Sequence, residues 1–204
     1  MSEKASAEAQ IKQLQAQIEP HFLFNTLSNV LSMLDSDPQK GKTMLMDLIQ
    51  YLRMSLTKIR EEMSTIDMEM DMIRAYLDIY KVRMGNRLCY SIDLPEYLGP
   101  VSLPPMLLQP LVENAIKHGL EPNINGGEIA IRVSENKGNI RIDVRDSGQG
   151  FVSDGRDGIG IANIKERLKS LYNNRAHLVL KDVQPHGVEA TLEVPNEHHP
   201  GDHR

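Results

Sequence analysis

The sequence predicts an α+β protein in which an N-terminal helical hairpin precedes a sandwich of helices and a mixed, largely antiparallel sheet. Two observations predict this fold. Apolar residues recur at helical spacing through residues 3–59, whereas residues 87–194 contain paired segments that alternate apolar and polar side chains. Because these strands come in adjacent pairs rather than in strict alternation with helices, the helices should cover one face of the sheet.

The first third of the chain is predicted to be helical. Residues 3–18 show the apolar spacing of a short coiled coil. Amphipathic helices are expected at 21–34 and 38–59, with Asp37 as the N-cap of the second helix. One hairpin buries its apolar seam poorly, whereas two hairpins make a four-helix bundle, so we expect a homodimer.

The remaining residues show a different pattern. Helices are predicted at 65–84, 103–119 and 159–172, and strands at 87–94, 127–134, 139–146, 176–182 and 187–194. A charged stretch at 60–65 indicates a linker. The expected organisation is therefore a helical domain at 1–62, an α+β domain at 63–196 and a disordered tail at 197–204.

Composition excludes several classes of function. The 204 residues include 23 basic and 28 acidic side chains, a net charge of -5, so no direct nucleic-acid contact is expected. The single cysteine, Cys89, excludes an internal disulfide. No apolar run approaches the roughly 18–20 residues that span a bilayer. We expect a cytoplasmic location, with membrane attachment only through a segment upstream of this sequence.

Two clusters of polar side chains lie on predicted helices. His21 and Asn25 are four residues apart and share a helix face, although a core histidine with a hydrogen-bond partner would show the same spacing. Asn114, Lys117 and His118 also share a face. Their amide oxygen, ammonium and imidazole could hold a hydrated magnesium ion and a polyphosphate, and the alternative is a solvated helix face.

Two further clusters are rich in glycine. Asp146 ends a predicted strand and is followed by Gly148 and Gly150, which allow either close approach of a ligand or a plain turn. Gly158 and Gly160 precede a helix whose free N–H groups could bind an anion. The sequence contains no P-loop motif, and the glycine spacing is a poor dinucleotide-binding fingerprint.

The order of these clusters carries more information than any one of them. A histidine helix followed by ENAIKHG, DSGQGF and GIGIAN resembles the layout of LytS-type sensor histidine kinases. The segments QIEPHFLFNTL, YLDIYKVRMGNRL, LPPMLLQPLVENAIKHG and IKERLKSLY belong to the same resemblance, which covers about residues 11–195. It implies phosphoacceptor helices that dimerise, followed by a GHKL ATP-binding domain with the Bergerat fold.

The resemblance implies an enzyme of two-component signalling. The chain would be the catalytic core of a protein histidine kinase that uses ATP and Mg2+ to phosphorylate itself. The phosphoryl group would then pass to an aspartate of a response regulator, often a LytTR-type DNA-binding protein in this family. A GHKL scaffold or degenerate kinase that binds ATP without phosphotransfer is the alternative. A metal site formed by the tail histidines His198, His199 and His203 is a less favoured interpretation.

Each cluster acquires a role from the resemblance. His21 would be the phosphoacceptor, Asn114 the magnesium ligand and Lys117 the basic group near the phosphates. His118 would lie beside the adenine, and Asp146 would accept a hydrogen bond from the adenine amino group. The ATP lid would start at Gly148 and Gly150, and the backbone of Gly158 and Gly160 would lie near the phosphates.

The general base stays open at this stage. Phe22 stands where many histidine kinases carry an acidic residue directly after the phosphoacceptor. Glu113 is the first candidate for the proton acceptor and Glu19 the second. Asn25 can orient the imidazole ring or a phosphate, but an amide cannot accept the proton. Pro110 stands where related motifs often carry a polar or acidic residue.

Overall fold

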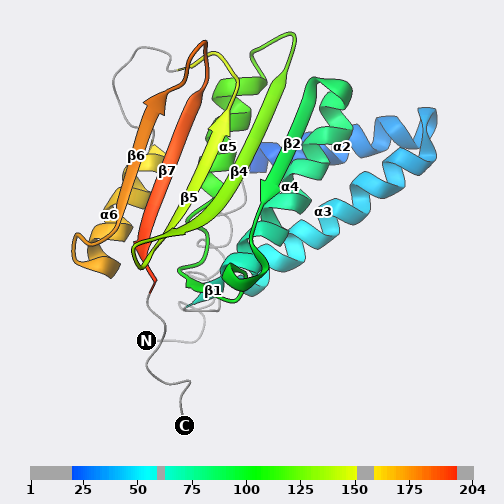
Figure 1. Cartoon of the computed structure of the whole chain (residues 1–204). Coiled ribbons are helices and arrows are strands. Elements are labelled where there is room, and N and C mark those ends of the chain that lie inside the picture. The colour runs from blue at the N-terminus through cyan, green and yellow to red at the C-terminus, as the bar shows by residue number, and fades with distance from the viewer. Residues whose placement is uncertain (1–19, 59–62, 151–158, 197–204) are drawn as a thin grey trace.

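The computed structural model describes residues 20–58, 63–150 and 159–196 (Figure 1). The predictions for residues 3–18, Glu19, Gly158 and the tail lie outside the described residues. The helices are α2 (Pro20–Ser36), α3 (Pro38–Lys58), α4 (Ile66–Met84), α5 (Gln109–Asn114) and α6 (Ile159–Tyr172), with the π-helical segment η3 (Ala115–Leu120). The strands are β1 (Ser64–Thr65), β2 (Leu88–Asp93), β3 (Ser102–Leu103), β4 (Gly127–Asn136), β5 (Asn139–Asp146), β6 (His177–Asp182) and β7 (Val188–Pro195).

Helices α2 and α3 form the predicted hairpin. The backbone N–H of Lys40 donates to Asp37 Oδ1 at 3.2 Å, which is the predicted N-cap interaction. On α2 the inner face is formed by Phe22, Thr26 and Val30, all buried. The other apolar stripe of α2 is exposed in the single chain and consists of Phe24, Leu27, Leu31 and Leu34. Leu56 of α3 is exposed as well.

Helix α4 lies between the hairpin and the sheet. The Thr65 side chain caps its N-terminus by accepting from the backbone N–H of Met68, and Gly85 ends it with φ of +60°. Glycine adopts this left-handed conformation without steric cost. Eleven α4 side chains are buried, and all of them except Glu69 belong to one hydrophobic core that also contains α2 and α3 side chains such as Phe22 and Leu48.

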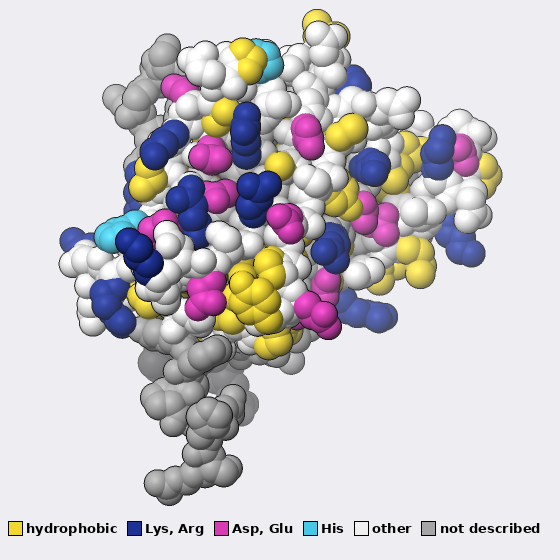
Figure 2. Space-filling model, in the orientation of Figure 1, with side chains coloured by type: hydrophobic (Ala, Val, Ile, Leu, Met, Phe, Trp, Pro, Cys, Tyr) yellow, Lys and Arg dark blue, Asp and Glu magenta, His cyan; other side chains and the backbone are white. Residues whose placement is uncertain are grey.

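The main sheet has the strand order β2-β4-β5-β7-β6. Strands β2 and β4 are parallel and the other pairs are antiparallel, which confirms the mixed, largely antiparallel sheet of an α+β fold. The β4–β5 turn passes through Lys137 and Gly138, both with positive φ. Helices α4, α5 and α6 lie behind the sheet in Figure 1, and Figure 2 shows acidic and basic side chains intermixed over the front.

The predicted helix at 103–119 is wrong in its first part. Leu103 belongs to β3, which pairs with β1, and the helix begins only at Gln109. The physical reason is the Pro104-Pro105 pair, since proline supplies no backbone N–H and disfavours helical backbone in the residue before it. Residues 64 and 65, predicted to be part of a linker, are β1.

None of the helices within residues 20–58, 63–150 and 159–196 combines the length and the apolar character that crossing a membrane requires.

Candidate functional site

The segment that carries Asn114 changes its helical pitch in the middle. Asn114 is the last residue of α5, and Lys117 and His118 lie on the π-helical turn that follows. Such wide turns are rare and often occur at functional sites. The prediction of a shared face assumed α-helical pitch throughout and did not anticipate this turn. Asn114 and Lys117 are half-buried, His118 is exposed, and Lys117 Nζ lies 3.7 Å from Glu113 Oε2.

Asp146 lies at the end of β5 and is only 5% exposed. Its Oδ1 accepts a hydrogen bond of 2.8 Å from the backbone N–H of Gly148. Burial raises the pKa of Asp146, while hydrogen bonds from the backbone of Gly148 and Val188 act in the opposite direction. The result is a sheltered, directional acceptor at the end of the strand.

Two glycines allow this acceptor to lie against the end of the π-helical segment. A Cβ at Gly119 would be 2.7 Å from Asp146 Oδ1, and a Cβ at Gly148 would be 2.3 Å from the Gly119 Cα. Side chains at either position would therefore overlap with neighbouring atoms. The sequence places residue 119 only at the end of a predicted helix. Its position as the last residue of the ENAIKHG motif was the available signal that Gly119 lies at the site.

The first turn of α6 lies beside α5. A Cβ at Gly160 would be 3.6 Å from the Cβ of Pro110, an ordinary contact distance. Gly150 has φ of +80°, so a left-handed turn follows Asp146 within four residues. The structure thus brings Asp146, Gly148, Gly160 and the Asn114 segment into one region, while Gly158 lies outside the described residues.

His21 lies in the first turn of α2, on a different helix from the other site residues. Its ring is exposed, and Asn25 Nδ2 lies 3.2 Å from each ring nitrogen, so the two side chains share a face as the spacing predicted. The next residue, Phe22, is 3% exposed and anchors this turn in the core. Among the described residues, no hydrogen bond joins His21 to the Asp146 region.

Two residues near the site were missed at the sequence level. Gln109 and Tyr51 are each 2% exposed, and Gln109 Nε2 donates to the Tyr51 hydroxyl at 3.3 Å and to Glu113 Oε1 at 3.1 Å. A glutamine at the start of an apolar helix was the available signal. Its partner on α3 is 58 residues away, so no local pattern could identify the contact.

The residues present fit a magnesium ion that is shared with a nucleotide. Within the described ranges, no three His, Cys, Asp or Glu side chains are grouped as a metal site. Mg2+ commonly keeps several waters and binds through one or two protein oxygens together with substrate phosphates. The half-buried amide of Asn114 offers one such oxygen.

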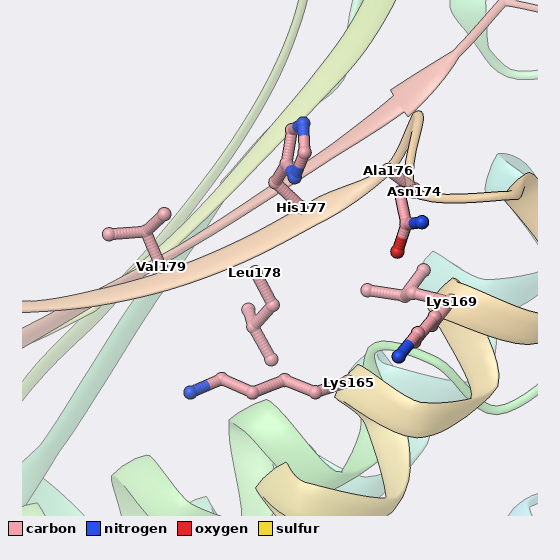
Figure 3. Close-up of a pocket in the computed structure, with 8 residues that line it drawn as sticks. Lys165, Lys169, Asn174, Ala176, His177, Leu178 and Val179 are labelled. Atoms are coloured by element: carbon pink, nitrogen blue, oxygen red, sulfur yellow. The ribbon is translucent and has the colours of Figure 1, made fainter.

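A separate cavity of about 370 Å³ lies between α6 and β6. Figure 3 shows Lys165 and Lys169 reaching it from α6, and His177, Leu178 and Val179 from β6. None of the predicted site residues lines this cavity. It therefore belongs to the outer edge of the sheet rather than to the region around Asp146.

Two protein-family models match consecutive parts of the chain. The model described as "Histidine kinase" matches residues 9–88. The model described as "Histidine kinase-, DNA gyrase B-, and HSP90-like ATPase" matches residues 104–198. The first match contains His21 and Asn25, and the second contains Asn114, Asp146 and Gly160.

Similar proteins are sensor kinases. The sensor protein LytS of Oceanobacillus iheyensis is 34% identical over 194 residues, 88% of this chain and 33% of the relative. Sensor histidine kinase YpdA of Escherichia coli is 33% identical over 202 residues, 94% of this chain and 35% of the relative. The chain thus spans about a third of the length of these relatives.

A solved structure of a histidine kinase domain has a similar fold. The histidine kinase domain of the blue-light activated histidine kinase EL346 from Erythrobacter litoralis superposes with a TM-score of 0.52. That match is 14% identical in sequence and covers 94% of this chain and 93% of the other, so it speaks for the fold alone. The two family models and the sensor-kinase relatives lead to one assignment. The chain belongs to the LytS-type sensor histidine kinases.

Proposed function

We propose that this chain is the cytoplasmic catalytic core of a two-component sensor kinase. It phosphorylates itself on His21 with ATP and passes the phosphoryl group to an aspartate of a response regulator, with a LytTR-type regulator as the proposed partner. Its helical and ATP-binding domains meet near residue 62. The observation that carries this proposal is the contact of Asp146 with Gly119 and Gly148, at the end of the segment that holds Asn114.

The nucleotide would bind with its adenine at Asp146 and its phosphates beside Asn114 and Lys117. The buried carboxylate is a directional acceptor for the adenine amino group, and the exposed His118 lies on the same π-helical turn. Mg2+, when held by the Asn114 amide oxygen, would neutralise charge on the phosphates. The first turn of α6, which contains Gly160, would bring backbone N–H groups toward the same phosphates.

The transfer step needs a nucleophile and a proton acceptor. The lone pair of one His21 ring nitrogen attacks the γ-phosphorus, the new N–P bond forms, and the bond to the ADP oxygen breaks. The proton on the other ring nitrogen then passes to a carboxylate. Glu113 is the proposed acceptor, because it lies one residue before Asn114, and Asn25 orients the ring from one turn away.

Incubation with Mg2+ and γ-labelled ATP tests this function. The chain should acquire label that is labile in acid and stable in base, as phosphohistidine is. Asn114→Asp should label about tenfold more slowly, because a carboxylate places a like charge beside the triphosphate. Asn139→Asp, the same change at the far end of β5, should label like the parent chain. ATP binding without label would instead favour a GHKL scaffold that lacks phosphotransfer.

A dimer is the second part of the proposal. Phe24 is 69% and Leu31 66% exposed on α2, and Leu56 on α3 is 47% exposed, so both hairpin helices present apolar side chains to solvent. Contiguous exposed apolar surface of this kind marks an interaction site. A second hairpin would cover it and complete a four-helix bundle.

Leu31→Asp should weaken this dimer by at least about tenfold, because each protomer would bury a carboxylate where it had buried a leucine. Sedimentation velocity over a concentration series measures the change. Ser32→Asp, an exposed neighbour on the same helix, should leave the dissociation constant unchanged. Equal dimerisation of the parent and Leu31→Asp chains would place the interface elsewhere.

A further inference from the structure

A single buried amide connects the phosphoacceptor hairpin to the helix of the candidate base. Gln109 is the first residue of α5 and its Nε2 donates to two acceptors, the Tyr51 hydroxyl on α3 at 3.3 Å and Glu113 Oε1 at 3.1 Å. The Glu113 carboxylate also lies 3.7 Å from Lys117 Nζ. The hydrogen-bonded path Tyr51–Gln109–Glu113 therefore runs between the two predicted domains.

Tyr51 also contacts the residue that follows the phosphoacceptor. The Phe22 ring lies 5.6 Å from the ring of Tyr51, 5.2 Å from that of Tyr76 and 5.7 Å from that of Tyr80, measured between centroids. These four rings form an aromatic cluster from α2, α3 and α4. Because Tyr51 touches both Phe22 and Gln109, the first turn of α2 and the side chain of Glu113 are held by the same residue.

The other groups around Glu113 are consistent with this proximity. Burial raises the pKa of Tyr76 well above its usual range, and the neighbouring Tyr80 and the charge of Glu113 raise it further. The groups near the Glu113 carboxylate include Lys117 from the same segment, Tyr76 from α4 and, through Gln109, Tyr51 from α3. The base and the aromatic cluster lie within electrostatic reach of each other.

Gln109 makes these contacts at a cost. Its Oε1 is buried and has no hydrogen-bond partner among the described residues. Buried polar atoms without partners are rare in native proteins, and an apolar side chain of the same size would avoid the cost. A purely structural role does not explain why a glutamine stands here, whereas donation from its amide to Glu113 does.

We propose that Gln109 and Tyr51 are positioning residues for the proton acceptor of autophosphorylation. Gln109 orients the Glu113 carboxylate by direct donation, and Tyr51 holds the Gln109 amide, so Glu113 is held in place when the hairpin packs as it does here. This inference rests on the proposed function, since it takes Glu113 as the acceptor of the His21 proton.

Three variants test it in the full chain. Gln109→Met removes the donor at similar length, Tyr51→Phe removes only the hydroxyl, and the third variant combines both. Gln109→Met should lower the autophosphorylation rate about tenfold with unchanged ATP affinity. The double variant should be no slower than Gln109→Met, because Tyr51 acts through Gln109. Tyr80→Phe, in the same aromatic cluster, should match the parent chain.

A readout independent of activity separates this inference from the proposed function. The carbon-13 shift of the Glu113 carboxyl, measured by NMR at one neutral pH, should change in Gln109→Met and stay as in the parent chain in Tyr80→Phe, because only the first variant removes a donor to that carboxylate. An unchanged shift in Gln109→Met would overturn the inference even if the parent chain labels normally. A changed shift in a chain that never labels would contradict the proposed function, and with it the positioning role.

Discussion

The His21→Gln variant should carry no acid-labile phosphate after incubation with Mg2+ and γ-labelled ATP, a loss of about a thousandfold or more relative to the parent chain. Removal of a nucleophile eliminates the covalent step itself, and such losses are far larger than those from removing an orienting group. Because the His21 ring is exposed and Phe22 anchors the turn, the substitution should leave folding intact.

The matched control is His177→Gln, an exposed histidine on β6 at the cavity beside α6. This variant should label like the parent chain. Both variants should keep the melting temperature and ATP affinity of the parent, measured by differential scanning fluorimetry and isothermal titration calorimetry. Acid-labile label retained in His21→Gln would move the phosphoacceptor to another residue.

Asp146→Asn should lower ATP affinity about 100-fold. A hydrogen bond to a charged acceptor contributes about 1.5–3 kcal/mol, and leaving buried donors unpaired adds to the loss. Asp146 already accepts a hydrogen bond from the backbone N–H of Gly148. In the asparagine variant one side-chain oxygen is replaced by an NH2 group, which would face the adenine amino group or the Gly148 N–H, and these are donors as well. Titration calorimetry with ATP and Mg2+ measures the change directly.

Asp143→Asn is the matched control on the same strand. Asp143 accepts from the Thr191 hydroxyl at 2.6 Å and from Arg141, so this variant should lose stability without losing ATP affinity. If Asp146→Asn bound ATP as tightly as the parent chain, Asp146 would have no part in nucleotide recognition.

The pH dependence of binding offers a second check on Asp146. Burial raises its pKa, so its carboxylate takes up a proton at a higher pH than an exposed aspartate, and ATP affinity should fall as the pH is lowered through that range. The ATP affinity of Asp146→Asn should not fall over this pH range, because an amide does not take up the proton. Because the pKa of Asp146 is raised in the folded protein, its contribution to folding stability is greatest at low pH and is lost as the pH rises through the folded pKa. Titration of Asp146 therefore does not unfold the protein at low pH, and unfolding linked to it cannot account for the loss of ATP affinity there.

Local patterns in the sequence determined the elements and the order of the candidate site. The alternation in β4 and β5, with Lys137 and Gly138 between them, predicted a hairpin because side-chain period and turn conformation depend on neighbouring residues alone. Gly85 ended α4 where expected for the same reason. The motifs around His21, Asn114 and Asp146 predicted a kinase by their resemblance to a family.

Only the tertiary structure decided what each face contacts. Phe22 and Phe24 both satisfy helical spacing, yet Phe22 packs among the tyrosines and Phe24 is 69% exposed, because burial depends on α4, more than forty residues further along the chain. The pairing of β1 with β3 and the hydrogen bond from Gln109 to Tyr51 also join distant segments. Periodicity determines which residues share a face, whereas long-range packing determines what that face meets.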